Sequence, residues 1–414
     1  MALIRALNSG VSGLKSFQAK MDVIGNNIAN VETAGFKSSR VTFAELMNQR
    51  LGRTDSGGES SPQMENQVGL GVRIASIDRD YSQGVMQNTG KGTDLALEGK
   101  GFFLVQDQGQ NFMTRAGNFV FNKDGQLVDQ GGRFVQGYNA DSDGNIQGGG
   151  ATRNITVDFE NVFPPRQTDE VIVGGNLSGE EGTTRVLSTT AYDSLGNAHS
   201  LVMEFTRTAN ENEWDYEVSF PDGGTVGAGQ TGTVEFDSNG NISSSSVIAI
   251  TNFDPESGAN VFDLDIHLGS ADQGVSFTQF AGANNAKVIA QNGHTEGRLL
   301  DIAIDGDGRL QGIYDNGRNQ TLSQIAIAQV QNENGLEMMG SGLFRTTSAA
   351  GEVFVGSAES LAGTSVNSGA LEGSNVDLAK EFTEMITSQR AYQSNARVIS
   401  TSDEMLMEAV NLKR

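Results

Sequence analysis

The 414-residue chain contains no cysteine and only five prolines. Without cysteine it has no disulfides, no thiolate zinc clusters and no thiol chemistry. All five prolines lie between Pro62 and Pro255, which leaves both ends of the chain free to be helical. No run of about 18 apolar residues occurs, and the opening residues lack the hydrophobic region of a secretory signal. Composition alone therefore favours a cytoplasmic protein that does not insert into a membrane.

Positive charge is also scarce, because 28 Lys and Arg face 51 Asp and Glu, a net charge of −23. Nucleic-acid backbones and anionic membranes require a positive face, so the sequence predicts neither as a partner. Residues 1–31 carry +2 and residues 374–414 carry −1, which leaves −24 on residues 32–373. Near-neutral ends can crowd at a shared core, whereas an acidic body suits an exposed outer surface.

Patterns that carry catalysis or bind metals are missing. His199, His267 and His294 are far apart and lie in no metal-ligand spacing. Residues 139–144 resemble the start of a calcium loop, but Gly150 stands where that loop needs a bidentate glutamate. No G-x-S-x-G elbow, phosphate loop or dinucleotide motif is present. The sequence therefore predicts no catalytic residue, no metal and no cofactor, and a protein that is not an enzyme.

Both ends of the chain carry apolar residues seven apart, the pattern of a coiled-coil seam. Ser374 and Asp377 are positioned to form a capping box at the start of the second seam. We predict that the two terminal helices, 1–31 and 374–414, pair with each other and with neighbouring subunits. The predicted subunit-contact residues are Leu7, Leu14, Phe17, Met21, Ile24, Ile28, Leu378, Phe382, Met385, Tyr392, Ile399 and Leu406.

An amphipathic helix that packs only on its own domain is the common alternative for such stripes. Here the stripes lie at opposite ends of the chain, and both are flanked by polar, glycine-rich segments. These segments are TDSGGESSPQMENQ at 54–67 and AESLAGTSVNSGALEGS at 358–374. Helices that leave the body in this way are placed for assembly.

The middle of the chain reads as an antiparallel all-β body, because Gly- and Asn-rich turns recur between short strand-like runs. Examples are DSLGN at 193–197 before LVMEF at 201–205, and DSNGN at 237–241 after WDYEVSF at 214–220. The fold class predicted is mainly β with α-helical coiled-coil ends, in several discontinuous domains. The predicted organisation is a helical domain of 1–31 and 374–414, linkers 32–71 and 363–373, an inner β-domain of 72–143 and 287–362, and an inserted outer β-domain of 144–286.

Two long segments resemble the terminal signatures shared by the rod and hook proteins of the bacterial flagellum. They are MDVIGNNIANVETAGFKSSRVTF at 21–43 and LEGSNVDLAKEFTEMITSQRAYQSNARVISTSDEML at 371–406. Blocks within 93–138 and 325–344 are similar to the same family. YDSLGNAHSLVMEF at 192–205, with Trp214 and the long insertion, resembles hook rather than rod proteins. The family-motif residues are Asn26, Asn27, Asn30, Gly35 and Phe36.

The resemblance implies a structural subunit that self-assembles into a hollow, flexible hook acting as a universal joint, with the helical ends forming the inner tube. It also implies export through the flagellar type III apparatus without a cleaved signal peptide, and assembly outside the cell. The implied partners are other copies of the chain, the distal rod, the hook cap, the hook–filament junction protein and the export apparatus. Two alternatives stay open: a distal rod subunit, and an extracellular β-rich carbohydrate-binding protein.

Overall fold

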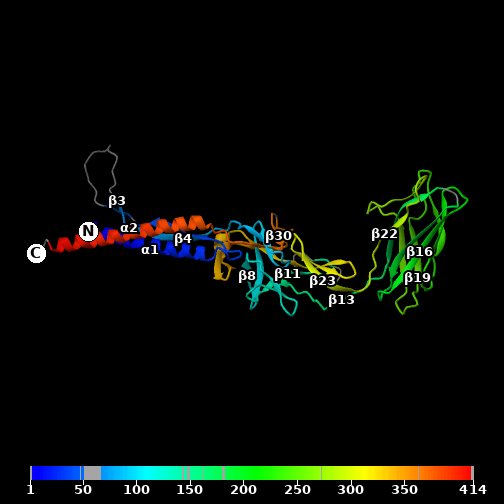
Figure 1. The fold of residues 1–414 in the computed structure, drawn as a ribbon, viewed down its shortest axis with the longest axis horizontal. Helices are drawn as coiled ribbons and strands as arrows, with labels where there is room; N and C mark the ends of the chain where they lie inside the picture. The colour runs from blue at the N-terminus through cyan, green and yellow to red at the C-terminus, as the bar shows by residue number, and fades with distance from the viewer. Residues whose placement is uncertain are drawn as a thin grey trace. The chain divides into compact units, whose positions relative to one another are not determined.

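The computed structural model describes residues 2–46, 48–50, 67–141, 144–146, 150–160, 162–179, 182–271, 273–361 and 363–411. This part of the chain is mainly β-strand with one helix at each end, which confirms the predicted fold class. The chain divides into two compact units (Figure 1). Unit 1 comprises 1–158, 302–311 and 320–414, and unit 2 comprises 159–301 and 312–319.

The boundaries of unit 2 differ from those of the predicted insertion. The sequence places that insertion at 144–286, whereas the main segment of unit 2 runs from 159 to 301. Unit 2 also takes residues 312–319, a hairpin turn in which Gly317 N–H donates to the Tyr314 carbonyl. The sequence pattern of this hairpin is the same as that of the hairpins in unit 1. The pattern alone therefore could not assign residues 312–319 to unit 2. The strands that contribute residues to both units are β23 (Gly297–Ile304), β24 (Arg309–Tyr314) and β25 (Asn319–Ile325).

Two long helices, α1 (Ala2–Ala29) and α2 (Leu378–Asn411), form at the proline-free ends of unit 1. The predicted capping box is wrong in one respect. Asp377 itself caps α2, because its Oδ1 accepts hydrogen bonds from the N–H groups of Ala379 (2.9 Å) and Lys380 (3.2 Å). Ser374 accepts instead from Val376 N–H, ahead of the helix.

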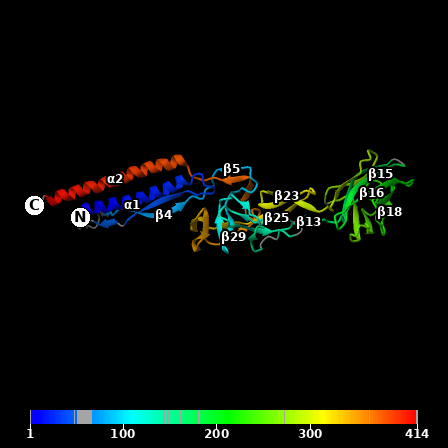
Figure 2. The same cartoon turned by 60° about the horizontal axis from the view of Figure 1, so that its bottom comes forward.

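A two-stranded ribbon, β1 (Ser39–Glu45) with β4 (Val72–Arg79), lies alongside α1 (Figures 1 and 2). Gly71 permits the close approach, since a Cβ there would lie 2.2 Å from Ser12 Oγ, and its φ of +118° suits only glycine. The rings of Phe17 and Phe43 meet at 5.7 Å. A segment predicted as linker, 32–71, thus contains a strand that packs on the helix.

The body of unit 1 is a sheet in the order β25-β11-β7-β8-β28-β27. Its core includes Phe102, Leu104, Met113 and Phe344, all buried. Strands β30 and β31, in the second predicted linker, pair with β6 and β5. The other strands of unit 1 are β2 (Asn48–Arg50), β3 (Gln67–Gly69), β5 (Met86–Asn88), β6 (Leu95–Glu98), β7 (Phe102–Asp107), β8 (Gln110–Thr114), β9 (Val120–Phe121), β10 (Leu127–Val128), β11 (Phe134–Asn139), β12 (Arg153–Asn154), β26 (Ile327–Val330), β27 (Leu336–Gly340), β28 (Leu343–Thr346), β29 (Val353–Gly356), β30 (Ser365–Ser368) and β31 (Ala370–Glu372).

Unit 2 contains two sheets, β15-β16-β17-β18 and β19-β20-β14-β21, whose inward side chains form one core around Trp214. The alternation of FDLDIHL in β20 matches its buried–exposed pattern. The prediction of a wholly antiparallel body is wrong here, because β14 pairs in parallel with both β20 and β21. The strands are β13 (Val162–Phe163), β14 (Glu170–Ser178), β15 (Thr184–Tyr192), β16 (Ala198–Arg207), β17 (Glu213–Ser219), β18 (Thr231–Glu235), β19 (Val247–Phe253), β20 (Phe262–Leu268), β21 (Phe277–Phe280) and β22 (Lys287–Gln291).

Asp193 organises the turn between β15 and β16. Its Oδ1 accepts from the N–H groups of Leu195 and Asn197, and its Oδ2 accepts from the side chains of Asn197 and Ser257 and lies 3.2 Å from His199 Nε2. Burial raises the pKa of Asp193, but the hydrogen bonds from Ser257, Asn197 and His199 outweigh it and hold the pKa well below its usual range. The turn is therefore locked by an ionised carboxylate.

We predict that Asp193→Ala lowers the free energy of unfolding of unit 2 by about 3 kcal/mol, because buried donors lose their acceptor. Since the folded-state pKa is depressed, the contribution of Asp193 is present above its ordinary value of 3.8 and is lost as the pH falls from there through the folded-state value. Urea unfolding followed by the fluorescence of Trp214, the single tryptophan, measures both effects.

Asp237→Ala is the matched control, because Asp237 caps the same kind of turn through Asn239 and Asn241 on an exposed surface. It should cost less than Asp193→Ala and remove a smaller part of the acid dependence, because the backbone N–H of Asn241 lowers the pKa of Asp237 as well but on an exposed surface. Equal losses from the two substitutions would show that the buried partners of Asp193 add nothing.

Candidate functional site

The terminal helices α1 and α2 pack against each other as an antiparallel pair (Figures 1 and 2). Residues early in α1 contact residues late in α2, and residues late in α1 contact the start of α2. Gly10 faces Ile399, Lys20 Nζ lies 3.2 Å from Glu384 Oε2, and Asn27 Nδ2 donates to Glu381 Oε1 at 3.1 Å. The pair thus spans nearly the full length of α1.

Small residues let the helices approach closely. A Cβ at Gly10 would lie 3.0 Å from Ile399 Cγ1, and one at Gly13 would lie 2.9 Å from Asn395 Nδ2. Ser16 on α1 and Ser388 on α2 are also buried. In the sequence, Gly10 stands between Leu3 and Phe17 in a row of residues seven apart, where an apolar side chain would be expected. The close approach of Ile399 explains the glycine, and the packing offsets its cost to helix propensity.

The predicted contact residues on α1 are all buried or half-buried. Ile24 is 3% exposed, and the other five, Leu7, Leu14, Phe17, Met21 and Ile28, are half-buried. On α2 the predicted set divides. Met385, Ile399 and Leu406 are half-buried, whereas Leu378, Phe382 and Tyr392 are exposed.

The exposed members belong to a second apolar side of α2, which does not pack on α1. Heptad spacing alone does not distinguish this side from the side that packs on α1. Ile386 is 52% exposed, and Met405 and Met407 are each 57% exposed. The name "outer face of α2" is used below for Leu378, Phe382, Ile386, Tyr392 and Met407, which lie on one side of the helix; Val398 and Met405 are exposed on another side. No other described part of this chain buries these side chains, and five large apolar residues exposed on one side of a helix are typical of an interaction surface.

The asparagines of the family motif tie α1 to strand β1 and close the end of the helix. Asn27 is buried, and its side chain donates to the Ser39 carbonyl and accepts from the Ser39 N–H. Asn30 donates to the Asn26 carbonyl, and Thr33 Oγ1 donates to Asn30 Oδ1. The Asn27 amide thus anchors the start of β1, and the Asn30 amide satisfies a carbonyl in the last turn of the helix.

Gly35 and Phe36 bring the chain onto the β-body. Gly35 has a φ of +69°, and a Cβ there would lie 2.6 Å from the backbone of Arg115 and Ala116, so no other residue fits. Its N–H donates to the Glu372 carbonyl at 2.7 Å, and Phe36 is 7% exposed. The turn after α1 is therefore held directly against the segment that leads into α2.

A buried ion cluster, which we call the junction triad, fixes this meeting point. Glu372 Oε1 lies 2.7 Å from Lys37 Nζ, and its Oε2 lies 3.3 Å from Arg115 Nη1. None of the three side chains is more than 3% exposed. Lys37 also donates to the Ser82 carbonyl and Arg115 to the Gly99 carbonyl. Burial lowers the pKa of Lys37 and of Arg115, and Glu372 opposes the shift in both.

The junction triad is absent from the residues that sequence reasoning selects, although each member lies in a block that carries the family resemblance. Lys37 follows Gly35 and Phe36, Arg115 lies in TRAGNF, and Glu372 lies in LEGSN. The sequence did offer one sign of the junction triad: in each of three distant blocks, a charged residue stands beside a glycine-containing motif that is buried in the structure. Charge alone does not show which of many acidic residues is buried.

The described residues hold no cluster of three or more possible metal ligands, and no described helix is long and apolar enough to span a membrane. His199 is engaged with Asp193, His267 lies 3.8 Å from Glu170, and His294 stacks on Phe163. Asp143, part of the incomplete calcium loop, lies outside the described residues.

Comparison with known proteins identifies the family to which the blocks of the resemblance belong. Residues 7–37 match the flagella basal body rod protein family, 96–174 the flagellar hook protein FlgE/F/G D1 domain, 174–294 the flagellar basal body protein FlaE D2 domain, and 367–412 the flagellar basal body rod FlgEFG protein C-terminal family. The flagellar hook protein FlgE of Borreliella burgdorferi is 36% identical, covering 99% of this chain and 100% of that protein. The chain belongs to the flagellar hook protein family.

Two other hook proteins are similar to this chain, one in sequence and one in fold. FlgE of Salmonella typhimurium is 33% identical over 99% of this chain and 100% of its own length. The crystal structure of the Helicobacter pylori flagellar hook protein FlgE2 matches the fold with a TM-score of 0.53 at 14% identity, covering 69% of this chain and all of that one. The predicted resemblance to hook proteins is confirmed, and the protein is a component of the bacterial flagellum.

Replacing Gly10 by Leu should destabilise the α1–α2 pair by about 1 to 3 kcal/mol, because the new side chain must displace Ile399. Gly25→Leu is the control, since a Cβ at Gly25 meets no atom within 4 Å and a leucine there gains helix propensity. Circular dichroism of helix melting measures both. The close-packing explanation fails if the two substitutions change helix stability in the same direction.

Glu372→Gln should cost unit 1 about 3 to 5 kcal/mol, because Lys37 and Arg115 would remain buried without a carboxylate. The matched control is Glu337→Gln, which breaks a half-exposed pair with Arg345 and should cost less than about 1 kcal/mol. Hydrogen exchange of the Gly35 amide reports the opening of the junction triad. Similar exchange rates in the two variants would contradict a central role for Glu372.

Proposed function

We propose that the protein is a structural subunit that polymerises into a hollow, flexible tube and transmits torque between the flagellar motor and filament as a universal joint. The observation that carries the proposal is the outer face of α2, which stays exposed although α2 is already paired with α1. Heterologous contacts of such a face with other copies do not close on themselves, so they build a helical polymer rather than a fixed oligomer.

The predicted contact residues take two roles in this proposal. The buried and half-buried set on α1, with Met385, Ile399 and Leu406, holds α1, α2 and the β1–β4 ribbon together within one subunit. Leu378, Phe382 and Tyr392, together with Ile386, meet neighbouring subunits in the inner tube. The acidic β-units make outer contacts that slide as the tube bends, and sliding favours polar, hydrated interfaces.

Several finer properties come from the hook protein family rather than from any measured contact. We propose export through the flagellar type III apparatus without a cleaved signal, assembly outside the cell, and contacts with the distal rod, the hook cap and the hook–filament junction protein. We propose no catalytic activity, since the histidines and the buried carboxylates of the described residues all serve structural contacts; these carboxylates are Asp94, Asp129, Asp193 and Glu372.

We predict that Ile386→Asp blocks polymerisation and leaves Trp214 unfolding unchanged, because an aspartate at a packed subunit contact is buried without a partner. Electron microscopy of the purified chain measures the outcome: wild type should form bent tubes, and the variant should remain monomeric. Straight, rigid polymers of wild type would point to a rod-like product instead.

Val261→Asp is the control, because Val261 is equally exposed at 51% but lies in unit 2, just before β20. This variant should still polymerise. If Ile386→Asp formed normal tubes as well, the outer face of α2 would not be a subunit contact.

A further inference from the structure

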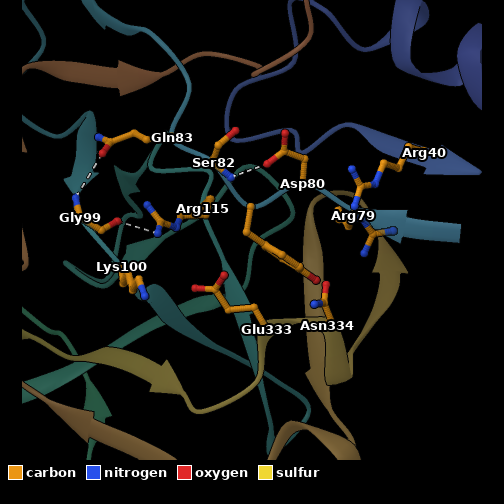
Figure 3. A pocket seen from close by; sticks show the side chains of 11 residues that line it. Arg40, Arg79, Asp80, Ser82, Gln83, Gly99, Lys100, Arg115, Glu333 and Asn334 are labelled. Carbon is orange, nitrogen blue, oxygen red and sulfur yellow. Dashed lines mark hydrogen bonds between the residues drawn. The ribbon is translucent and has the colours of Figure 1, made fainter.

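A cavity of about 590 Å³ opens on unit 1 beside the junction triad (Figure 3). Its wall brings together strand ends and turns that are distant in the sequence. Arg40 and Arg79 come from the β1–β4 ribbon, Lys100 from the turn before β7, and Arg115 from the segment after β8. The other lining residues are Asp80, Tyr81, Ser82, Gln83, Gly99, Glu333 and Asn334.

Positive charge prevails in the cavity although the chain as a whole carries −23. Four lining cations face two lining carboxylates, Asp80 and Glu333. Behind the wall, Lys37 balances Glu372, so the positive charge of Arg115, already one of the four lining cations, is retained in the cavity. Asp80 is also occupied, since its Oδ1 accepts from Ser82 N–H at 2.9 Å.

Two of the cations are available to a ligand. Arg115 is committed to Glu372 and the Gly99 carbonyl, and Arg79 lies over the Phe344 ring and donates to Met338. The exposed side chains of Arg40 and Lys100 make no ion pair or hydrogen bond with any described residue. A flexible lysine and an arginine at the rim of a cationic cavity suit carboxylates.

Unit 2 carries an excess of the opposite charge. It has 22 acidic and 6 basic residues, a net charge of −16. On the outward face of its β15–β18 sheet, Glu204 lies directly opposite Glu217, and Asp215 lies on the same face two pairs along, opposite Thr206. All three are exposed. Like charges directly opposite each other destabilise a sheet, and no described cation forms an ion pair with them.

From these two surfaces we infer that the cationic cavity of unit 1 receives the carboxylates Glu204, Asp215 and Glu217 from unit 2 of a second copy of the chain. The inference rests on the proposed polymer and adds a specific contact to it. Ion pairs between exposed side chains are hydrated and re-form readily with small shifts, so this contact tolerates the sliding that a bending tube requires.

Zero-length carbodiimide coupling tests the contact. Polymers are grown from an equal mixture of ¹⁴N- and ¹⁵N-labelled full-length chains, and cross-linked peptides are identified by mass spectrometry. We expect peptides of mixed isotope content that join Lys100 to Glu204, Asp215 or Glu217. Lys123, exposed in a turn of unit 1 away from the cavity, should not join them. If Lys100 couples only within one chain, or to other carboxylates, the inference is overturned.

Charge reversal provides a second test. Arg40→Glu with Lys100→Glu should raise the critical concentration for polymerisation about tenfold, and Glu204→Lys with Glu217→Lys should do the same. The chain carrying all four substitutions should return toward wild type, because the pairing is restored with inverted sign. A quadruple variant no better than either double variant would refute the contact. Failure of the wild type itself to polymerise would refute the proposed function instead.

Discussion

One carboxylate, that of Glu372, fixes how the two ends of the chain meet the β-body. It lies 2.7 Å from Lys37, just after α1, and 3.3 Å from Arg115, just after β8, and α2 begins six residues later at Leu378. Because all three side chains are buried, losing any one leaves an uncompensated charge. Gly35 fits only where this cluster places the Arg115 backbone. The direction in which both helices leave the body is therefore set at one point.

The helix pair that starts there has two different sides. Between α1 and α2, Gly10 and Gly13 allow contacts of about 3 Å with Ile399 and Asn395, so the inner side is close-packed and specific. The outer face of α2 carries larger side chains, such as Phe382 and Ile386, that are about half exposed. A rigid pair with an unpaired apolar face is suited to join other rigid pairs. The burial of several such side chains can supply the cohesion of an inner tube.

Much of this arrangement could be predicted from the sequence, because heptad spacing and the absence of proline determine helices locally. The same spacing could not tell the half-buried Ile399 from the exposed Tyr392, since both lie in one heptad row and only the packing partner decides. Strand β1 falls within a predicted linker because its partner, β4, lies beyond a long polar segment. The parallel pairing of β14 depends on chain order in space, which alternation does not encode. Glu372 is one of 51 acidic residues, and only tertiary contacts distinguish it.

The distribution of charge explains why the cohesion and the flexibility of an assembly can lie in different parts of the subunit. Unit 2 carries −16, so in the proposed polymer the copies of unit 2 on neighbouring subunits repel one another within a screening length of roughly 8 to 10 Å. Repulsion of this kind opposes tight outer packing and must be outweighed by apolar contacts elsewhere, for which the near-neutral helices are suited. Exposed ion pairs contribute at most about 1 kcal/mol each, so outer contacts made of them can break and re-form while the inner ones persist.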